Sequence, residues 1–337
     1  MRGACLLASC LTMGCARSSP APATAVHAAT PLHVSPLADL VPSAGLRWIV
    51  EARPRALLAE PSVLDALSTT LAGTDLDAVT RACGGLDVRS SDDFVVAGYE
   101  ASTVFLAHEV IDPPRIEAAF TARVADVEGR AIDSASHDSR ESVTRLWGAS
   151  GKDHESVVVF GREAVGYCAG ADAPLRAAEL FAVRKLKRAR PAWQTPPLDQ
   201  LGVLLGEAPF RAAAPGPFVG DWSLGLGGLL ASASAVGLAA LVDGETLRVH
   251  AVLAGDWGQR AHDAEERLER AYTTLTVSAV GRLLGLDKPA APPRFTSRPD
   301  SIDLDVRLAL RPLAIGIRDA TSSGVADMMR GARPALP

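Results

Sequence analysis

The sequence predicts an α+β protein in which helices pack on one face of an antiparallel sheet. Segments 94–99 (FVVAGY) and 103–110 (TVFLAHEV) are strand-like runs separated by three residues, as in a β-hairpin. Segment 234–254 has the turn dipeptide Asp243-Gly244 in its middle, which predicts a second hairpin. Helical patterns alternate with these hairpins, and short turns join strands only when the strands run antiparallel.

The first half of the chain alternates between strand and helix patterns. Segment 46–52 (LRWIVEA) predicts a strand. Pro61 begins a helix that Gly73 interrupts, and Asp75 caps a second short helix that ends at Gly84-Gly85. The other predicted elements of this half are a helix from Pro113 with Ile116, Phe120, Val124 and Val127 on one face, strands at 143–147, 156–160 and 163–168, and a helix at 172–190.

Segment 222–242 contains no charged residue and has the length of a membrane span, but its composition predicts a different structure. Gly, Ala and Ser dominate it and gain little from contact with lipid. It also continues into the hairpin at Asp243-Gly244, so its second half is predicted to be a buried strand. Its GLGGLL sequence has Leu230 where a dinucleotide-binding fingerprint needs its third glycine.

The longest predicted helix spans 256–286, where small or apolar residues recur in steps of three and four. Segment 302–310 then alternates, with Ile302 and Leu304 on the core side and Asp303 and Asp305 on the other. A last helix begins at Pro312. Both halves therefore run from a hairpin to a helix, then to strand and helix, and the sequence leaves open whether they are a duplicated unit.

The composition of successive segments predicts how the chain is divided into domains. Residues 1–14 read as a signal peptide, and 15–42, rich in Ala, Pro, Ser and Thr, read as a flexible tether. Residues 43–190 and 219–331 form the two predicted α+β halves, separated by a Pro- and Gly-rich linker at 191–218.

The leader has one basic residue, Arg2, before a short apolar run, and it contains the sequences LASC (7–10) and TMGC (12–15). This pattern resembles the lipobox of bacterial lipoproteins, in which a lipidated cysteine becomes the new N-terminus. The resemblance implies lipidation at Cys15, with Cys10 as the alternative if translation starts upstream. Ala16 follows the cysteine where inner-membrane lipoproteins carry Asp, so the resemblance favours the outer membrane. A cleaved signal with incidental cysteines is the competing interpretation.

The remaining composition restricts partners and redox chemistry. A net charge of −5 disfavours nucleic acid as a partner. Beyond the leader only Cys83 and Cys168 remain, and exported proteins form disulfides. Two separate buried thiols are favoured over a Cys83–Cys168 bond, because both cysteines continue apolar patterns.

No catalytic constellation, cofactor motif or metal-ligand pair is predicted. His262 and Glu266 approach a zinc motif but are better explained as solvated helix residues, and His108 and Glu109 point to opposite faces of their strand. Asp303 and Asp305 share a face and are paired-acid candidates, although a solvent-facing strand explains them more simply. The basic segment 184–190 is interpreted as a solvated helix end, with a membrane contact as the alternative.

Three functions remain. The first is a membrane-tethered envelope lipoprotein that binds or scaffolds without catalysis. The second is a periplasmic carrier of a lipid or other apolar ligand, whose cavity would be lined by the small residues of 225–241 and the core side of 302–310. The third is a hydrolase that uses dispersed acids.

Overall fold

The computed structural model describes residues 32–71, 75–128, 134–138, 142–150, 153–186 and 189–329. Its strands are β1 (Leu46–Ala52), β2 (Asp93–Tyr99), β3 (Ser102–His108), β4 (Ser134–Asp138), β5 (Val143–Ser150), β6 (Asp153–Phe160), β7 (Ala164–Gly170), β8 (Phe210–Pro215), β9 (Ala235–Asp243), β10 (Thr246–Ala254), β11 (Ala291–Ser297) and β12 (Ser301–Ala309). Its α-helices are α1 (Pro54–Leu58), α2 (Pro61–Thr70), α3 (Leu76–Ala82), α4 (Pro113–Glu128), α5 (Ala173–Ala182), α6 (Leu198–Leu205), α7 (Gly225–Gly228), α8 (Ala261–Val277), α9 (Ala279–Leu283) and α10 (Leu310–Met329). Its 3-10 turns are η1 (Leu37–Leu40), η2 (Val88–Ser90), η3 (Ala192–Gln194), η4 (Gly220–Leu224), η5 (Leu229–Ser232) and η6 (Gly258–Arg260).

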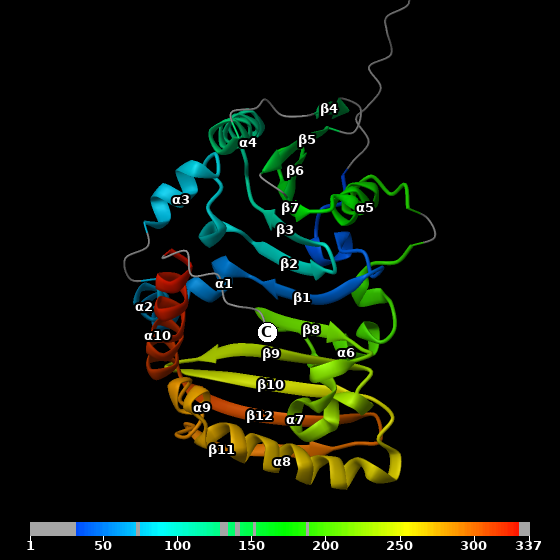
Figure 1. Cartoon of the computed structure of the whole chain (residues 1–337), viewed down its shortest axis with the longest axis vertical. Coiled ribbons are helices and arrows are strands. Elements are labelled where there is room, and N and C mark those ends of the chain that lie inside the picture. The colour runs from blue at the N-terminus through cyan, green and yellow to red at the C-terminus, as the bar shows by residue number, and fades with distance from the viewer. Residues whose placement is uncertain are drawn as a thin grey trace, which may run out of the picture.

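All twelve strands belong to one sheet, in the order β11-β12-β10-β9-β8-β1-β2-β3-β7-β6-β5-β4 (Figure 1). Every neighbouring pair is antiparallel. The predicted α+β class with an antiparallel sheet is therefore confirmed. The predicted hairpins are β2–β3 and β9–β10, and Gly244 supplies the positive φ of 62° that the second turn requires.

The two halves of the sheet have a similar layout. In the first, strands β1, β2 and β3 lie in chain order, α4 follows, and β7 and β6 continue the sheet beyond β3. In the second, β8, β9 and β10 lie in chain order, α8 follows, and β12 and β11 continue it beyond β10. The first half adds β5 and β4 at its edge. The halves meet where β1 pairs with β8, in the middle of the sheet in Figure 1.

Helices cover both faces of the sheet, whereas the sequence predicted a single covered face. We call the face that carries Ile49 and Val95 face A, and the opposite face, which carries Phe94, face B. On face A, α5 and α6 pack on a core that includes Val158. On face B, α4 packs on Val157 and Val159, and further along the sheet α8 packs on Ile302. Successive residues of β6 are buried on opposite faces, so apolar runs such as 157–160 need helices on both sides.

The region 191–218 is part of the fold and does not act as the predicted linker. It contains η3, α6 and β8, and β8 pairs with β1 on one side and β9 on the other. Leu198, Leu201 and Leu205 recur at helical spacing and bury one side of α6. Gly237 lets α6 approach β9, because an added Cβ would lie 2.9 Å from Leu205 Cδ1. Proline and glycine here mark close packing within the fold.

The predicted tether, 15–42, extends too far into the folded chain. Val34, Leu37, Leu40 and Val41 are buried in the core on face A, and η1 packs beside α5. An apolar spacing of three or four residues at 34–41 indicates this packing, but the surrounding Pro and Ser residues obscure it. Residues 1–31 lie outside the described part of the chain.

Several helix bounds differ from the predicted ones. The helix predicted at 172–190 ends at Ala182, and Arg184 adopts a φ of 54°, so the basic segment follows the helix. The helix predicted at 256–286 is divided at Ser278, whose extended backbone ends α8 and whose hydroxyl caps α9 by accepting a bond from Gly281 N at 2.9 Å. Strand β4 was not predicted.

The uncharged segment 222–242 divides into η4, α7, η5 and strand β9. Its second half thus forms a strand, as predicted. Within the described ranges, no helix has both the length and the apolar character needed to cross a bilayer.

The two cysteines of the folded chain are separate thiols on opposite faces of the sheet. Cys168 on β7 belongs to the face A core, whereas Cys83 follows α3 and lies beside Phe94 on face B. The sheet therefore separates them, and a bond between them is excluded by geometry. The sequence predicted both to be buried, but Cys83 is exposed because it ends a short surface helix.

The thiols should react at very different rates. In a chain with Cys5, Cys10 and Cys15 replaced by Ser, we expect one thiol to react rapidly with Ellman's reagent in the native state and the second only after unfolding. Burial raises the pKa of Cys168 to about 11, which also suppresses its thiolate. Cys83→Ser should abolish the rapid phase. Absence of any free thiol before reduction would contradict the separation.

Candidate functional site

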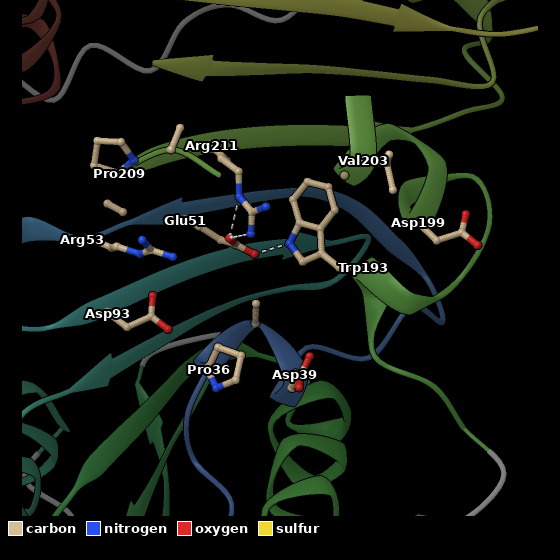
Figure 2. A pocket seen from close by; sticks show the side chains of 14 residues that line it. Pro36, Asp39, Glu51, Arg53, Asp93, Trp193, Asp199, Val203, Pro209 and Arg211 are labelled. Carbon is tan, nitrogen blue, oxygen red and sulfur yellow. Dashed lines mark hydrogen bonds and ion pairs between the residues drawn. The ribbon is translucent and has the colours of Figure 1, made fainter. Parts of the chain in front are cut away.

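A cavity of about 330 Å³ lies on face A where the two halves of the sheet meet (Figure 2). We call it the polar pocket. Strands β1 and β8 form its floor, and η1, η3 and α6 form its walls. The charged and aromatic residues that line it are Asp39, Glu51, Arg53, Asp93, Trp193, Asp199 and Arg211.

Glu51 and Arg211 form the floor of the polar pocket because the β1–β8 register places them opposite each other. Arg211 donates to Glu51 Oε2 from Nη2 at 2.5 Å and from Nε at 3.1 Å. Trp193 Nε1 donates to Glu51 Oε1, and the guanidinium of Arg211 lies 4.9 Å from the centre of the Trp193 ring. These contacts satisfy both carboxylate oxygens, as a buried charge requires.

Burial raises the pKa of Glu51 above its usual value, although Arg211 and Trp193 favour the ionised form. Glu51 is only 8% exposed, so loss of hydration dominates. The indole that bonds it is positioned by η3, where Ala192 N donates to Val41 O at 2.8 Å. Gly202 on α6 leaves room for the ring, because an added Cβ would lie 3.2 Å from Trp193 Cε3.

Aspartates surround the floor of the polar pocket. Asp93 Oδ2 accepts from Leu37 N at 2.8 Å, and Asp39 Oδ1 accepts from Gln194 Nε2 at 3.1 Å. Asp199 accepts from the neighbouring Gln200 N. These three carboxylates have no ion-pair partner among the described residues, and the exposed Arg53 guanidinium has none there either.

A second cavity, of about 230 Å³, lies on face B of the first half, and we call it the apolar pocket. It lies between the sheet and the α3–α4 region and is partly open to solvent. Aromatic and aliphatic side chains line it, among them Phe94, Phe105, Leu86, Val88, Ile116, Ala119, Phe120, Val157 and Val165.

Polar groups gather on one side of the apolar pocket. Arg123 Nη2 donates to Glu155 Oε1 at 2.8 Å and to the Tyr167 hydroxyl at 3.3 Å. Its guanidinium also lies 5.4 Å from the centre of the Tyr167 ring. Burial raises the pKa of Tyr167, so its hydroxyl stays protonated. Glu155 Oε2 is buried and has no hydrogen-bond partner in the part of the chain that the structure describes.

Asp303 and Asp305 share face A, but they do not form a solvent-facing acid pair. Asp303 is 3% exposed and lies 2.8 Å from Arg298 Nη1, and burial raises its pKa. Asp305 is held by Arg248 Nη2 at 3.1 Å and His250 Nδ1 at 3.4 Å. Each carboxylate thus has its own cation. The alternation of segment 302–310 predicts the shared face correctly but not that the sheet neighbours bury part of it.

The other predicted candidates have structural roles. His262 Nε2 and Glu266 Oε1 lie 3.6 Å apart on the exposed side of α8. No group of three His, Cys, Asp or Glu residues suited to a metal occurs within the described ranges. Glu109 is buried and accepts from Ser90 Oγ at 2.9 Å and Asp87 N at 3.1 Å.

The structure describes only part of the segments that were predicted to contact the membrane. In the basic segment 184–190, Arg184 Nη2 lies 2.9 Å from His33 Nδ1, and residues 187 and 188 lie outside the described ranges. Cys10 and Cys15 also lie outside them.

In the second half, the core side of 302–310 packs against neighbouring side chains, whereas the start of 225–241 borders an open cavity. Ile302 and Leu304 pack with Leu229, Leu230 and Leu268 in a hydrophobic core. Of the two segments, Leu226 and Gly227 line an open cavity of about 610 Å³ beside α8, and Arg267 and Arg270 make its other lining partly charged. The sequence analysis missed the apolar pocket in the first half and the Glu51 floor. One signal was present for the latter, because Glu51 shares the apolar side of its strand with Ile49.

The raised pKa of Glu51 predicts a pH dependence of stability. Its proton is held more tightly in the folded chain, so its contribution to the free energy of unfolding is complete below about pH 4.5 and is lost as pH rises through the folded-state pKa. The free energy of unfolding of wild type minus that of Glu51→Gln should therefore fall as pH increases across this window. Urea denaturation at a series of pH values measures it. A difference that stays constant or increases would contradict the raised pKa.

Comparisons with known proteins show similarity in fold alone. No family model and no curated protein matches the chain. Among solved structures, crystal form III of TP0453 matches with a TM-score of 0.51 and 11% identity, covering 85% of this chain and 99% of that one. Crystal form I matches with a TM-score of 0.49 and 11% identity, over 85% of this chain and 98% of that one. At this identity the chain shares the fold of TP0453, and its function must be argued from its own residues.

Proposed function

We propose that this chain is a membrane-tethered envelope lipoprotein that acts by binding an apolar ligand in the apolar pocket, without catalysis. The observation that supports it is the apolar pocket itself. Its lining is aromatic and aliphatic, yet it opens to solvent, and leaving such surface in water costs about 25 cal/mol per Å². A ligand that displaces water from this lining recovers that free energy.

The size of the apolar pocket restricts the ligand. Its volume of about 230 Å³ lies below the roughly 300–1,000 Å³ of sites that enclose drug-sized molecules. A single aliphatic chain or a small ring fits inside, while a larger molecule extends beyond the opening. Arg123 and Tyr167 lie where a polar end of such a molecule would meet the protein.

The leader supports the proposed location at the outer membrane, facing the periplasm. Lipidation at Cys15 leaves 32 − 15 = 17 residue steps before the first described residue, Leu32. Fully extended, this segment spans roughly 56 Å at about 3.3 Å per residue. A multiply acylated cysteine holds a protein firmly at a membrane, so the folded body would stay near the bilayer without a spanning helix.

Three of the candidate acids favour binding over catalysis. Glu51, Asp303 and Asp305 each lie within 3.1 Å of an arginine nitrogen. A carboxylate whose oxygen contacts an arginine is less available to exchange a proton with a ligand. We therefore assign these three groups to the fold rather than to hydrolysis.

Filling the apolar pocket should abolish ligand binding. Ala119 lines the pocket on α4, and the neighbouring Ala118 is exposed on the solvent side of the same helix. We expect Ala119→Trp to weaken binding of cis-parinaric acid at least tenfold, because the indole occupies the cavity. Fluorescence titration of the full chain in mild detergent measures it. Ala118→Trp is the matched control and should bind like wild type.

Equal affinity of the two tryptophan variants would place the probe elsewhere on the molecule. No saturable binding to wild type would also refute the proposed function. Thermal unfolding of each variant confirms that the fold is retained.

The anchor has a separate test. In the native host, radiolabelled palmitate should label wild type and Cys10→Ser but not Cys15→Ser, because only the lipidated cysteine carries the acyl chains. Label lost from Cys10→Ser and kept by Cys15→Ser would assign lipidation to Cys10. Absence of label from wild type would contradict the anchor.

A further inference from the structure

We propose that the polar pocket binds a small organic cation, an alkylamine or alkylguanidine, through Asp39 and Asp93. This site lies on the opposite face of the sheet from the apolar pocket and is independent of the function proposed above. Three features of the cavity support it, namely its balance of charge, the unused oxygens of the two aspartates, and an exposed apolar surface at its edge.

The charges that line the polar pocket favour a cation. Four acidic and two basic side chains line the pocket, so the net formal charge of its lining is 2 − 4 = −2. Glu51 and Arg211 neutralise each other on the floor, and Trp193 covers part of the guanidinium. The remaining charge belongs to Asp39, Asp93 and Asp199, opposed only by Arg53. A concave site with this balance attracts positive ligands.

Asp39 and Asp93 each have an oxygen available for a ligand. Asp39 uses Oδ1 to accept from Gln194, and Asp93 uses Oδ2 to accept from Leu37 N. Among the described residues, Oδ2 of Asp39 and Oδ1 of Asp93 have no hydrogen-bond partner. Figure 2 shows the two side chains on either side of Pro36, Asp39 on η1 and Asp93 at the start of β2. Both are half-buried, so their charge is screened less than that of a surface carboxylate.

The apolar surface at the edge of the pocket indicates that the cation carries an aliphatic part. Val203 lines the cavity from α6 yet is 81% exposed. Trp193 lies beside it, and Pro36 lies between the two aspartates in the view of Figure 2. An ammonium or guanidinium on a short aliphatic chain would meet the carboxylates with its charged end and these side chains with its stem.

Isothermal titration calorimetry of the full chain with agmatine tests the proposal. Agmatine carries a guanidinium and an amine on a four-carbon stem and has no carboxylate. We expect saturable binding with one site per chain. The double variant Asp39→Asn, Asp93→Asn should weaken it at least tenfold, since Asn keeps the oxygen acceptors for Gln194 and Leu37 N but removes the charge.

Two further variants make the test specific. Asp263→Asn removes the same charge from exposed α8 and should bind agmatine like wild type. Arg53→Gln removes the opposing charge and should tighten binding two- to threefold. If the double variant fails to fold, the single variant Asp39→Asn replaces it. Asp39 bonds only the Gln194 side chain, so this variant should keep the fold, and it should still weaken binding.

Several outcomes would overturn the inference. The inference is wrong if wild type shows no heat of binding or if the double variant and Asp263→Asn bind agmatine with equal affinity. It is also wrong if Arg53→Gln binds agmatine more weakly than wild type. Binding of the dianion glutarate at the same site would also overturn it. Ala119→Trp should leave agmatine affinity unchanged, so the proposals for the polar pocket and for the apolar pocket are tested independently.

Discussion

The antiparallel pairing of β1 with β8 is the interaction on which the rest of the molecule depends. It joins the two halves of the sheet, which share a five-strand layout to which the first half adds β5 and β4, and it does so over only four residue pairs. Backbone hydrogen bonds contribute about 1 kcal/mol each, so the junction needs further support. Helix α6 packs on β8, β9 and β10 on one side of the junction and on η3, which contacts η1 and through it β2 on the other side. Trp193 of η3 also donates to Glu51 of β1, and the Glu51–Arg211 ion pair links the two strands on the same face. The polar pocket is a consequence of this junction, because its floor consists of residues from both strands.

The polar pocket and the apolar pocket lie on opposite faces of the sheet, each beneath helical segments. On face A, α6 and η3 enclose a cavity whose floor is an ion pair, whereas on face B the α3–α4 region leaves one that is almost wholly apolar. The difference follows from the alternation of the strands. Glu51 faces one side, while Phe94 and Phe105 face the other. One sheet thus presents two chemically distinct sites.

Local patterns predicted much of the fold but not the contacts between distant segments. The hairpins, the helix from Pro113 and the amphipathic strand at 302–310 depend on neighbours in sequence, and all are present. Strand β8 pairs with β1, roughly 160 residues earlier in the chain, and with β9, about 25 residues later. The local sequence around β8 is rich in Pro and Gly and therefore predicted a linker instead of a strand. Neither pocket was predicted, because each forms where elements from several parts of the chain meet. Only Glu51, a charge on an apolar strand face, gave a local signal.

Native mass spectrometry of the full-length protein, purified from its host in mild detergent, tests the central claim most directly. The account predicts a population that carries one bound apolar molecule, released by organic solvent, and the loss of that population in Ala119→Trp but not in Ala118→Trp. Wild-type protein that shows only the mass of the chain and its acyl groups would contradict the account. The same adduct on both tryptophan variants would contradict it equally.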